Sequence, residues 1–160
     1  MTATFVIERA TPSDVGDIVQ LISELAEFER LLDQCVASPE QLREHLFGAR
    51  PYAEVLMARQ GGQSIGFALF FHNFSTFLTQ PGVYLEDIYV RPAHRGQGVG
   101  EALLRAVARI AVERGCGRFE WSVLDWNQRA IDFYKKLGAI QLTDWTVHRV
   151  AGPALIELAK

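Results

Sequence analysis

Apolar residues recur along the chain at spacings that change several times between two residues and about 3.6 residues. The first spacing is typical of strands and the second of amphipathic helices, so the pattern predicts a mixed α/β protein. Strands are predicted at 5–9, 52–60, 63–72, 83–90, 118–124, 139–143 and 153–159. Helices are predicted to begin at Thr11 and at Ser38, and to span 98–114 and 127–137.

Local signals support these boundaries. A helix start is predicted at Thr11, where Thr11 is the capping residue, Pro12 stands in the first turn and Asp14 is the acid three residues after the cap. The same start signal recurs at Ser38-Pro39. Gly61-Gly62 predicts a hairpin turn, and Gln80-Pro81-Gly82 predicts another turn. The predicted helix at 127–137 lies between an N-cap asparagine and a C-terminal glycine.

Composition narrows the class of protein. The 160 residues are 49% hydrophobic and 22% charged, which fits one globular domain over residues 1–160. A net charge of −3 argues against general nucleic-acid binding. No apolar stretch is long enough for a membrane span or a signal peptide, so we expect a cytoplasmic protein. The four histidines lack metal-ligand spacing, and no metal is expected; Cys35 and Cys116 are expected to be reduced thiols.

The segment from Tyr84 to Gly100 contains the strongest chemical signal. An acidic strand leads into a loop with three glycines, and a helix follows at once. Backbone N–H groups at such a helix start bind anions, and the segment therefore predicts a pyrophosphate site with Arg95 nearby. The glycine spacing and the position of the loop disfavour a dinucleotide-binding fingerprint, and no phosphate-loop motif occurs. The alternative is a glycine-rich turn that only connects strand to helix.

Two motifs then identify a family resemblance. Arg95-x-x-Gly98-x-Gly100 resembles motif A of the GNAT acyltransferases, and Asn127-x-x-Ala130-x-x-Phe133-Tyr134-x-x-x-Gly138 resembles their motif B. The chain is most similar to the diamine (spermidine/spermine) acetyltransferase branch, through Phe28-Glu29, Tyr84-Leu85-Glu86-Asp87, Trp126-Asn127 and Phe133-Tyr134-Lys135. The resemblance implies a GNAT fold with about six or seven strands, mostly antiparallel in one twisted sheet, and about four flanking helices. It also implies acetyl transfer from acetyl-CoA to a primary amine, and a homodimer.

The resemblance also implies which residues hold the coenzyme. Backbone groups of Ile88, Tyr89 and Val90 would pair with the pantetheine arm like an added strand. The pyrophosphate would be held by Arg95, Gly96, Gln97, Gly98, Val99 and Gly100, and the remainder would contact Asn127, Tyr134 and Lys136. For Asn127, a plain helix N-cap is an alternative that does not exclude the coenzyme role.

The reaction needs a base and an acid. A lysine-like amine has a pKa of about 10.4, so only ~1 molecule in 1000 is nucleophilic near neutral pH. Glu86 is the predicted general base, acting directly or through water, and strand alternation would point Asp87 to the opposite face. By resemblance, Tyr134 is the general acid that protonates the departing sulfur. The alternatives are an ordinary paired or solvent-facing carboxylate for Glu86, and a core position for Tyr134.

The acceptor is expected to be a small cationic amine. In the diamine branch, positions matching Phe28, Glu29, Glu86, Glu120, Trp121 and Ser122 line the acceptor site, whereas Glu24 and Glu27 fit a solvated helix face. A polyamine, a lysine-like amino acid, an aminoglycoside and a protein lysine remain alternatives, because the Gly61-Gly62 hairpin and the region 141–153 depart from the animal diamine enzymes. A regulatory domain that binds acetyl-CoA without turnover is the alternative from another functional class.

Overall fold

The computed structural model describes residues 4–160 and divides into two compact units, residues 1–122 and 123–160. Residues 1–3 of the predicted single domain lie outside the described residues. That these units act as one domain over 1–160 stays a prediction.

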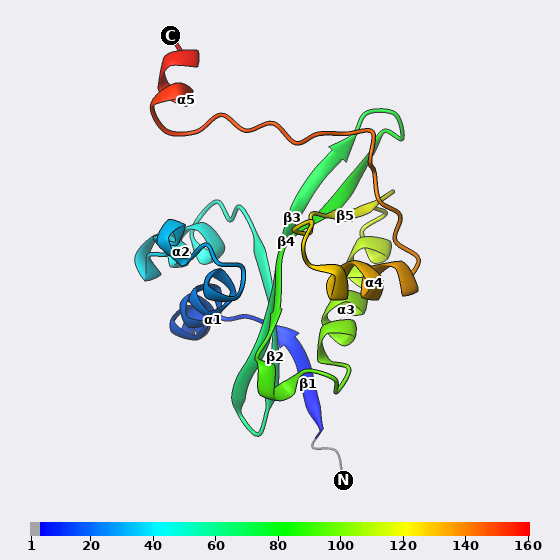
Figure 1. Cartoon of the computed structure of the whole chain (residues 1–160). Helices are drawn as coiled ribbons and strands as arrows, with labels where there is room; N and C mark the ends of the chain where they lie inside the picture. The colour runs from blue at the N-terminus through cyan, green and yellow to red at the C-terminus, as the bar shows by residue number, and fades with distance from the viewer. Residues whose placement is uncertain (1–3) are drawn as a thin grey trace. The chain divides into compact units, whose positions relative to one another are not determined.

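The first unit is a five-stranded sheet with helices on both faces (Figure 1). The strands follow chain order in space, and all neighbours are antiparallel except the last pair: β1 (Phe5–Arg9), β2 (Glu54–Gln60), β3 (Gln63–Ser75), β4 (Gln80–Val90) and β5 (Phe119–Trp121). One face is covered by α1 (Val15–Phe28) and α2 (Pro39–Phe47), and the other by α3 (Val99–Glu113). Short 3₁₀ turns at Pro12–Asp14, Leu32–Gln34 and Pro92–His94 connect these elements.

The sequence signals at the element ends act as predicted. The backbone N–H of Thr11 donates to the Asp14 carboxylate at 2.7 Å, and α1 follows directly. The hydroxyl of Ser38 accepts from the backbone N–H of Gln41 and caps α2. Gly61 and Gly62 adopt φ values of +56° and +80°, the left-handed conformation that the tight β2–β3 turn requires.

Each face of the sheet buries its own core. On the α1 side, Ile18 and Leu21 pack with Met57, Phe67 and Tyr89. On the α3 side, Val99, Leu103 and Val107 of the helix are almost completely buried. The two cores hold β4 in the interior of the sheet, and β4 is the strand that carries most of the predicted site.

The predicted turn at Gln80-Pro81-Gly82 is wrong, because these residues begin β4 and the turn lies at 76–79. Gly82 is needed for a different reason: a Cβ there would collide with the side chain of Asn73 on β3. A glycine that marks a close approach between strands resembles a turn glycine when only the sequence is read. The predicted strand at 118–124 is shorter than expected and spans only 119–121.

The second unit contains α4 (Gln128–Lys136) and α5 (Gly152–Leu158). The strands predicted at 139–143 and 153–159 are wrong, since 139–151 has no regular helix or strand and 152–158 is helical. Pro153 stands in the first turn of α5, where its missing N–H costs nothing, and a short apolar run does not distinguish strand from helix. The described chain therefore has five strands and five α-helices. The predicted α/β class is confirmed.

Candidate active site

The 95–100 bend, residues Arg95 to Gly100, joins the end of β4 to α3. Gly96 and Gly98 adopt φ values of +76° and +84°, so both need the left-handed freedom of glycine, and Gly98 is the N-cap of α3. Gly100 is different, because its helical backbone tolerates a side chain and an added Cβ would come no closer than 3.8 Å to Val90. The protein's own packing does not explain the glycine at 100.

β4 has an open edge directly before this bend. β5 pairs with β4 only at Val83, Tyr84 and Leu85. The backbone N–H of Arg91 donates to the carbonyl of Ile65 on β3 at 2.9 Å. The carbonyl of Val90 belongs to the same trans peptide group as that N–H, and it therefore points away from β3. Backbone groups alternate along a strand, and those of Ile88 therefore also face the open edge, whereas those of Tyr89 face β3.

At the far end of this edge, the first turn of α3 offers backbone donors. Ala102 is the first residue of the helix whose N–H reaches back to the carbonyl of Gly98, at 2.9 Å. The N–H groups that precede it have no partner within the helix and carry its partial positive charge. These donors suit an anionic group, and they follow the open edge of β4 in the chain.

Arg95 turns its side chain toward the α1 side of the sheet. Its Nε donates to the carbonyl of Val90 at 2.8 Å. Its guanidinium carbon lies 4.8 Å from the ring centroid of Phe28 and 5.5 Å from that of Tyr89. The structure therefore joins Arg95, predicted for the coenzyme, to Phe28, predicted for the acceptor.

A β-bulge interrupts β4 at Glu86. Leu69 pairs with Asp87 and Phe70 pairs with Leu85, so Glu86 is an extra residue on β4. Strict alternation fails at this point. Leu69 packs against the α1-side core, and the bulge brings Asp87 to that same face with Glu86 beside it. The bulge alters the alternation from which opposite faces were expected for these two carboxylates, and Glu86 itself is exposed.

Asp87 is the candidate that sequence reasoning missed. Burial raises its pKa to about 6, and the neighbouring charges of Glu86 and Glu29 add to the rise. Burial also raises the pKa of Glu29, which follows the last residue of α1. Asp87 thus lies within electrostatic range of both Glu86 on β4 and Glu29 at the end of α1. The adjacent acids Glu86-Asp87 were visible in the sequence, but the bulge that gathers them was not.

The three predicted acceptor residues of the β5 segment do not share one face of the strand. Glu120 and Ser122 lie on the face of Tyr84, since Glu120 pairs with Tyr84 and the Ser122 hydroxyl lies 2.7 Å from that of Tyr84. Glu120 also lies 2.8 Å from the guanidinium of Arg118, so its charge already has a partner. Trp121 packs edge-on against Phe119, and strand alternation places it on the opposite face from Glu120 and Ser122.

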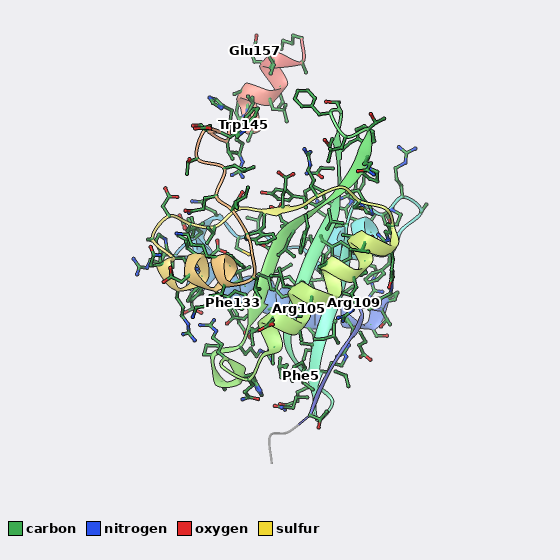
Figure 2. The ribbon with its side chains drawn as sticks, turned by 90° about the vertical axis from the view of Figure 1, so that its right-hand side faces the viewer. Phe5, Arg105, Arg109, Phe133, Trp145 and Glu157 are labelled. Carbon is green, nitrogen blue, oxygen red and sulfur yellow. The ribbon has the colours of Figure 1, made fainter. Side chains whose placement is uncertain are left out.

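The predicted residues of the second unit lie on and around α4. The side chain of Asn127 accepts from the backbone N–H of Ala130 at 3.2 Å and is the N-cap. Tyr134 is half-buried, and its ring centroid lies 5.5 Å from that of Phe133. Figure 2 labels Phe133 on this helix. Lys136 is exposed at the last turn. The coenzyme and catalytic roles of these residues stay predictions.

Two further findings bear on ligands. Within residues 4–160, no group of three or more histidine, cysteine, aspartate or glutamate side chains is arranged to hold a metal, and no helix is long and apolar enough to cross a membrane. A cavity of about 610 Å³ lies beside the start of β2, between Arg9, Tyr52 and His72. None of the predicted site residues lines it, so cavity size does not locate the chemistry here.

An open strand edge followed by a helix N-terminus suits an elongated anionic ligand. Residues 19–139 match the Acetyltransferase (GNAT) family, and the chain belongs to that family. It is an N-acetyltransferase, and the family uses acetyl-CoA as the acetyl donor.

The sequence is similar to those of known acetyltransferases over nearly its whole length. The thialysine N-epsilon-acetyltransferase of Sus scrofa is 42% identical over 98% of both chains. The spermidine/spermine N(1)-acetyltransferase-like protein 1 of Homo sapiens is 31% identical over 97% of this chain and 24% of its own length. The predicted resemblance to the diamine acetyltransferase branch is confirmed.

A solved structure supports the fold independently. An integron cassette protein from the mobile metagenome of V. cholerae superposes with a TM-score of 0.82, 27% identity and 98% coverage of both chains. The predicted GNAT fold is confirmed, with the corrected numbers of strands and helices given above.

Proposed function

We propose that the protein transfers an acetyl group from acetyl-CoA directly to the terminal primary amine of a small cationic acceptor. The acceptor classes are lysine-like amino acids, such as thialysine, and diamines or polyamines. One observation carries the proposal: the open edge of β4, suited to the coenzyme, lies on the same strand as the carboxyl cluster of Glu29, Glu86 and Asp87.

The described residues fit acetyl-CoA. The outward-facing backbone groups of Ile88 and the N–H of Val90 suit the amides of a pantetheine arm, whereas the carbonyl of Val90 already accepts from Arg95. The 95–100 bend with the N-terminus of α3 suits a pyrophosphate. The glycine at 100 supports this proposal. The protein's own packing would tolerate a side chain there, but a side chain would obstruct a ligand that lies close to the backbone. Asn127, Tyr134 and Lys136 are proposed to contact the coenzyme on the strength of motif B.

The carboxyl cluster fits a cationic acceptor. Like charges crowded in a partly buried place destabilise one another, and an ammonium group relieves that repulsion. Asp87 is held at a pKa of about 6 by burial and by its acidic neighbours, so a bound ammonium favours its ionised form and releases protons near that pH. We propose Phe28, Glu29 and Glu86 as acceptor residues together with Asp87. Glu120, Trp121 and Ser122 remain proposals that rest on the family resemblance alone.

The proposed chemistry needs one base and one acid. Glu86 accepts a proton from the acceptor ammonium, directly or through water, and frees the nitrogen lone pair. The thioester of acetyl-CoA supplies the carbonyl carbon to which the nitrogen bonds. The nitrogen then loses a second proton, to Glu86 once that residue has released the first to solvent. As the carbon–sulfur bond breaks, Tyr134 donates its phenolic proton to the sulfur and regains a proton from solvent. A backbone N–H at the open edge of β4, near Ile88 or Val90, stabilises the negative charge that develops on the carbonyl oxygen.

The proposal extends to assembly and location. Family resemblance supports a homodimer that acts on a small molecule. A cytoplasmic location and the absence of nucleic-acid binding stay predictions from the sequence pattern and the net charge of −3. Light scattering behind a sizing column tests the dimer, and a mass near 17.9 kDa would contradict it.

The function is tested by measuring free thiol release from acetyl-CoA across a panel of amines. The panel contains thialysine, lysine, ornithine, putrescine, spermidine, an aminoglycoside and a lysine-containing peptide. The proposal expects the small aliphatic amines to release thiol fastest. Calorimetric binding of acetyl-CoA without thiol release for any amine would favour the regulatory domain, and preferential turnover of the aminoglycoside or peptide would move the acceptor to that class.

A further inference from the structure

The packing around Arg95 connects two predicted binding sites that the sequence treats separately. Arg95 begins the 95–100 bend, and its Nε is bound to the carbonyl of Val90 at 2.8 Å. Its guanidinium lies against two aromatic rings, those of Phe28 and Tyr89, at 4.8 Å and 5.5 Å. A guanidinium held over aromatic faces gains a cation–π attraction and loses most of its rotational freedom before any ligand arrives.

The two rings beside Arg95 differ in burial, since Phe28 is 40% exposed at the end of α1 whereas Tyr89 is buried. Tyr89 is only 6% exposed and belongs to the α1-side core. Phe28 is the last residue of α1, and Glu24 lies one turn before it. Glu24 accepts two hydrogen bonds from Arg91, both at 3.0 Å, and Arg91 also donates to the carbonyl of Ser64 at 2.7 Å.

These hydrogen bonds from Arg91, the residue directly after β4, attach the last turn of α1 to the end of the strand. Glu24 is therefore not the solvated residue expected from the sequence. Burial raises its pKa, but hydrogen bonds from Arg91, Gln20 and Tyr89 outweigh burial and keep that pKa below its usual value. The carboxylate stays ionised and holds the end of α1 in place.

Resting on the acetyl-CoA site of the proposed function, we propose that Phe28 is a positioning residue for the coenzyme, which acts through Arg95. The ring of Phe28 keeps Arg95 in one orientation at the start of the 95–100 bend, so the bend is organised before the diphosphate binds. Glu24 and Arg91 serve the same purpose one step further away, since they hold the helix turn that carries the ring. Phe28 thereby belongs to the donor site as well as to the acceptor site for which the sequence predicts it.

The two roles of Phe28 make different predictions for the free enzyme. If Phe28 only lines the acceptor pocket, removing its ring changes the KM for the amine and leaves acetyl-CoA affinity unchanged. If it positions Arg95, the ring is needed for acetyl-CoA affinity when no amine is present. An exposed cation–π contact corresponds to about two- to fivefold in affinity, which is the expected weakening.

The experiment is calorimetric titration of acetyl-CoA into the whole chain without an amine. The variants are Phe28→Leu, which removes the ring, and Phe28→Tyr, which keeps it. Arg105→Gln is the matched control, because Arg105 pairs with Glu101 on the exposed surface of α3 in the same segment of the chain (Figure 2). We expect a Kd raised about two- to fivefold for Phe28→Leu and a wild-type Kd for Phe28→Tyr and the control.

The proposal is overturned if Phe28→Leu binds acetyl-CoA as the wild type does, or if Phe28→Tyr loses as much affinity as Phe28→Leu. Thermal unfolding checks that each variant is folded. Should Phe28→Leu not fold, Glu24→Gln replaces it, and a wild-type Kd for that variant also overturns the proposal. Failure of the proposed function is distinguished by the wild-type protein, which would then take up no acetyl-CoA.

Discussion

Replacing Asp87 by asparagine is expected to make the protein more stable at neutral pH. The wild-type carboxyl group has a pKa of about 6 in the folded chain, raised by burial and by Glu86 and Glu29 from an ordinary value of 3.8. A carboxyl group whose pKa is raised by folding destabilises the native state once it ionises. That penalty is absent below pH 3.8, grows between the two pKa values and is fully developed above pH 6.

The magnitude follows from the pKa difference. A rise of about two units corresponds to about 3 kcal/mol at pH 7, because each unit is about 1.4 kcal/mol. The asparagine amide has the same shape and no charge, but it still loses hydration on burial. We therefore expect Asp87→Asn to raise the free energy of unfolding by about 1–3 kcal/mol at pH 7 and to leave it nearly unchanged near pH 4.

Urea unfolding of both proteins at intervals between pH 4 and pH 7.5 measures this difference. Asp33→Asn is the matched control, since it makes the same chemical change at an exposed position in the turn after α1. A constant difference between wild type and Asp87→Asn across this range would refute the reasoning, as would a loss of stability that grows with pH. Thiol release should fall in the same variant, because the charge that weakens the fold is the one proposed to attract the acceptor.

Three further outcomes are expected. Glu86→Gln should lower kcat/KM for the amine by about 10²–10⁴-fold near neutral pH and less at high pH, where the free amine needs no base; an unchanged pH–rate profile would exclude Glu86 as base. Tyr134→Phe should keep the fold and the calorimetric affinity for acetyl-CoA while losing most turnover, and a wild-type rate would exclude it as the acid. Asp14→Asn should lower the free energy of unfolding by about 1–3 kcal/mol at pH 7. Burial raises the pKa of Asp14, but hydrogen bonds from Thr11 and Arg59 outweigh burial and hold that pKa below its usual value. The wild type loses that contribution as the pH falls through the lowered pKa, so urea unfolding at pH 7 and pH 3 should show a smaller difference at pH 3, and equal differences would contradict the assignment.

The parts of the fold that depend on neighbouring residues were predictable. The capping pattern at Thr11 and Asp14, the cap at Ser38 and the Gly61-Gly62 turn all work through contacts within a few residues, so the sequence contains the whole signal. The left-handed glycines at 96 and 98 belong to the same group, because their need for positive φ is local.

Other features depend on residues that are far apart in the chain. Gly82 was mistaken for a turn glycine because Asn73, the residue that requires the space, lies on the neighbouring strand. The helix at 152–158 was mistaken for a strand because a short apolar run is compatible with both structures.

By itself, the sequence determined the α/β class, the GNAT family and the glycine bend between β4 and α3, because each is written in local spacing or in a contiguous motif. Only the tertiary structure decided which charged groups meet. The bulge at Glu86 gathers Asp87 with Glu29, and the pairing of Glu24 with Arg91 fixes the ring of Phe28 beside Arg95. Register and packing are collective properties of several strands and a helix, and a shift of one residue in pairing changes which side chains share a face.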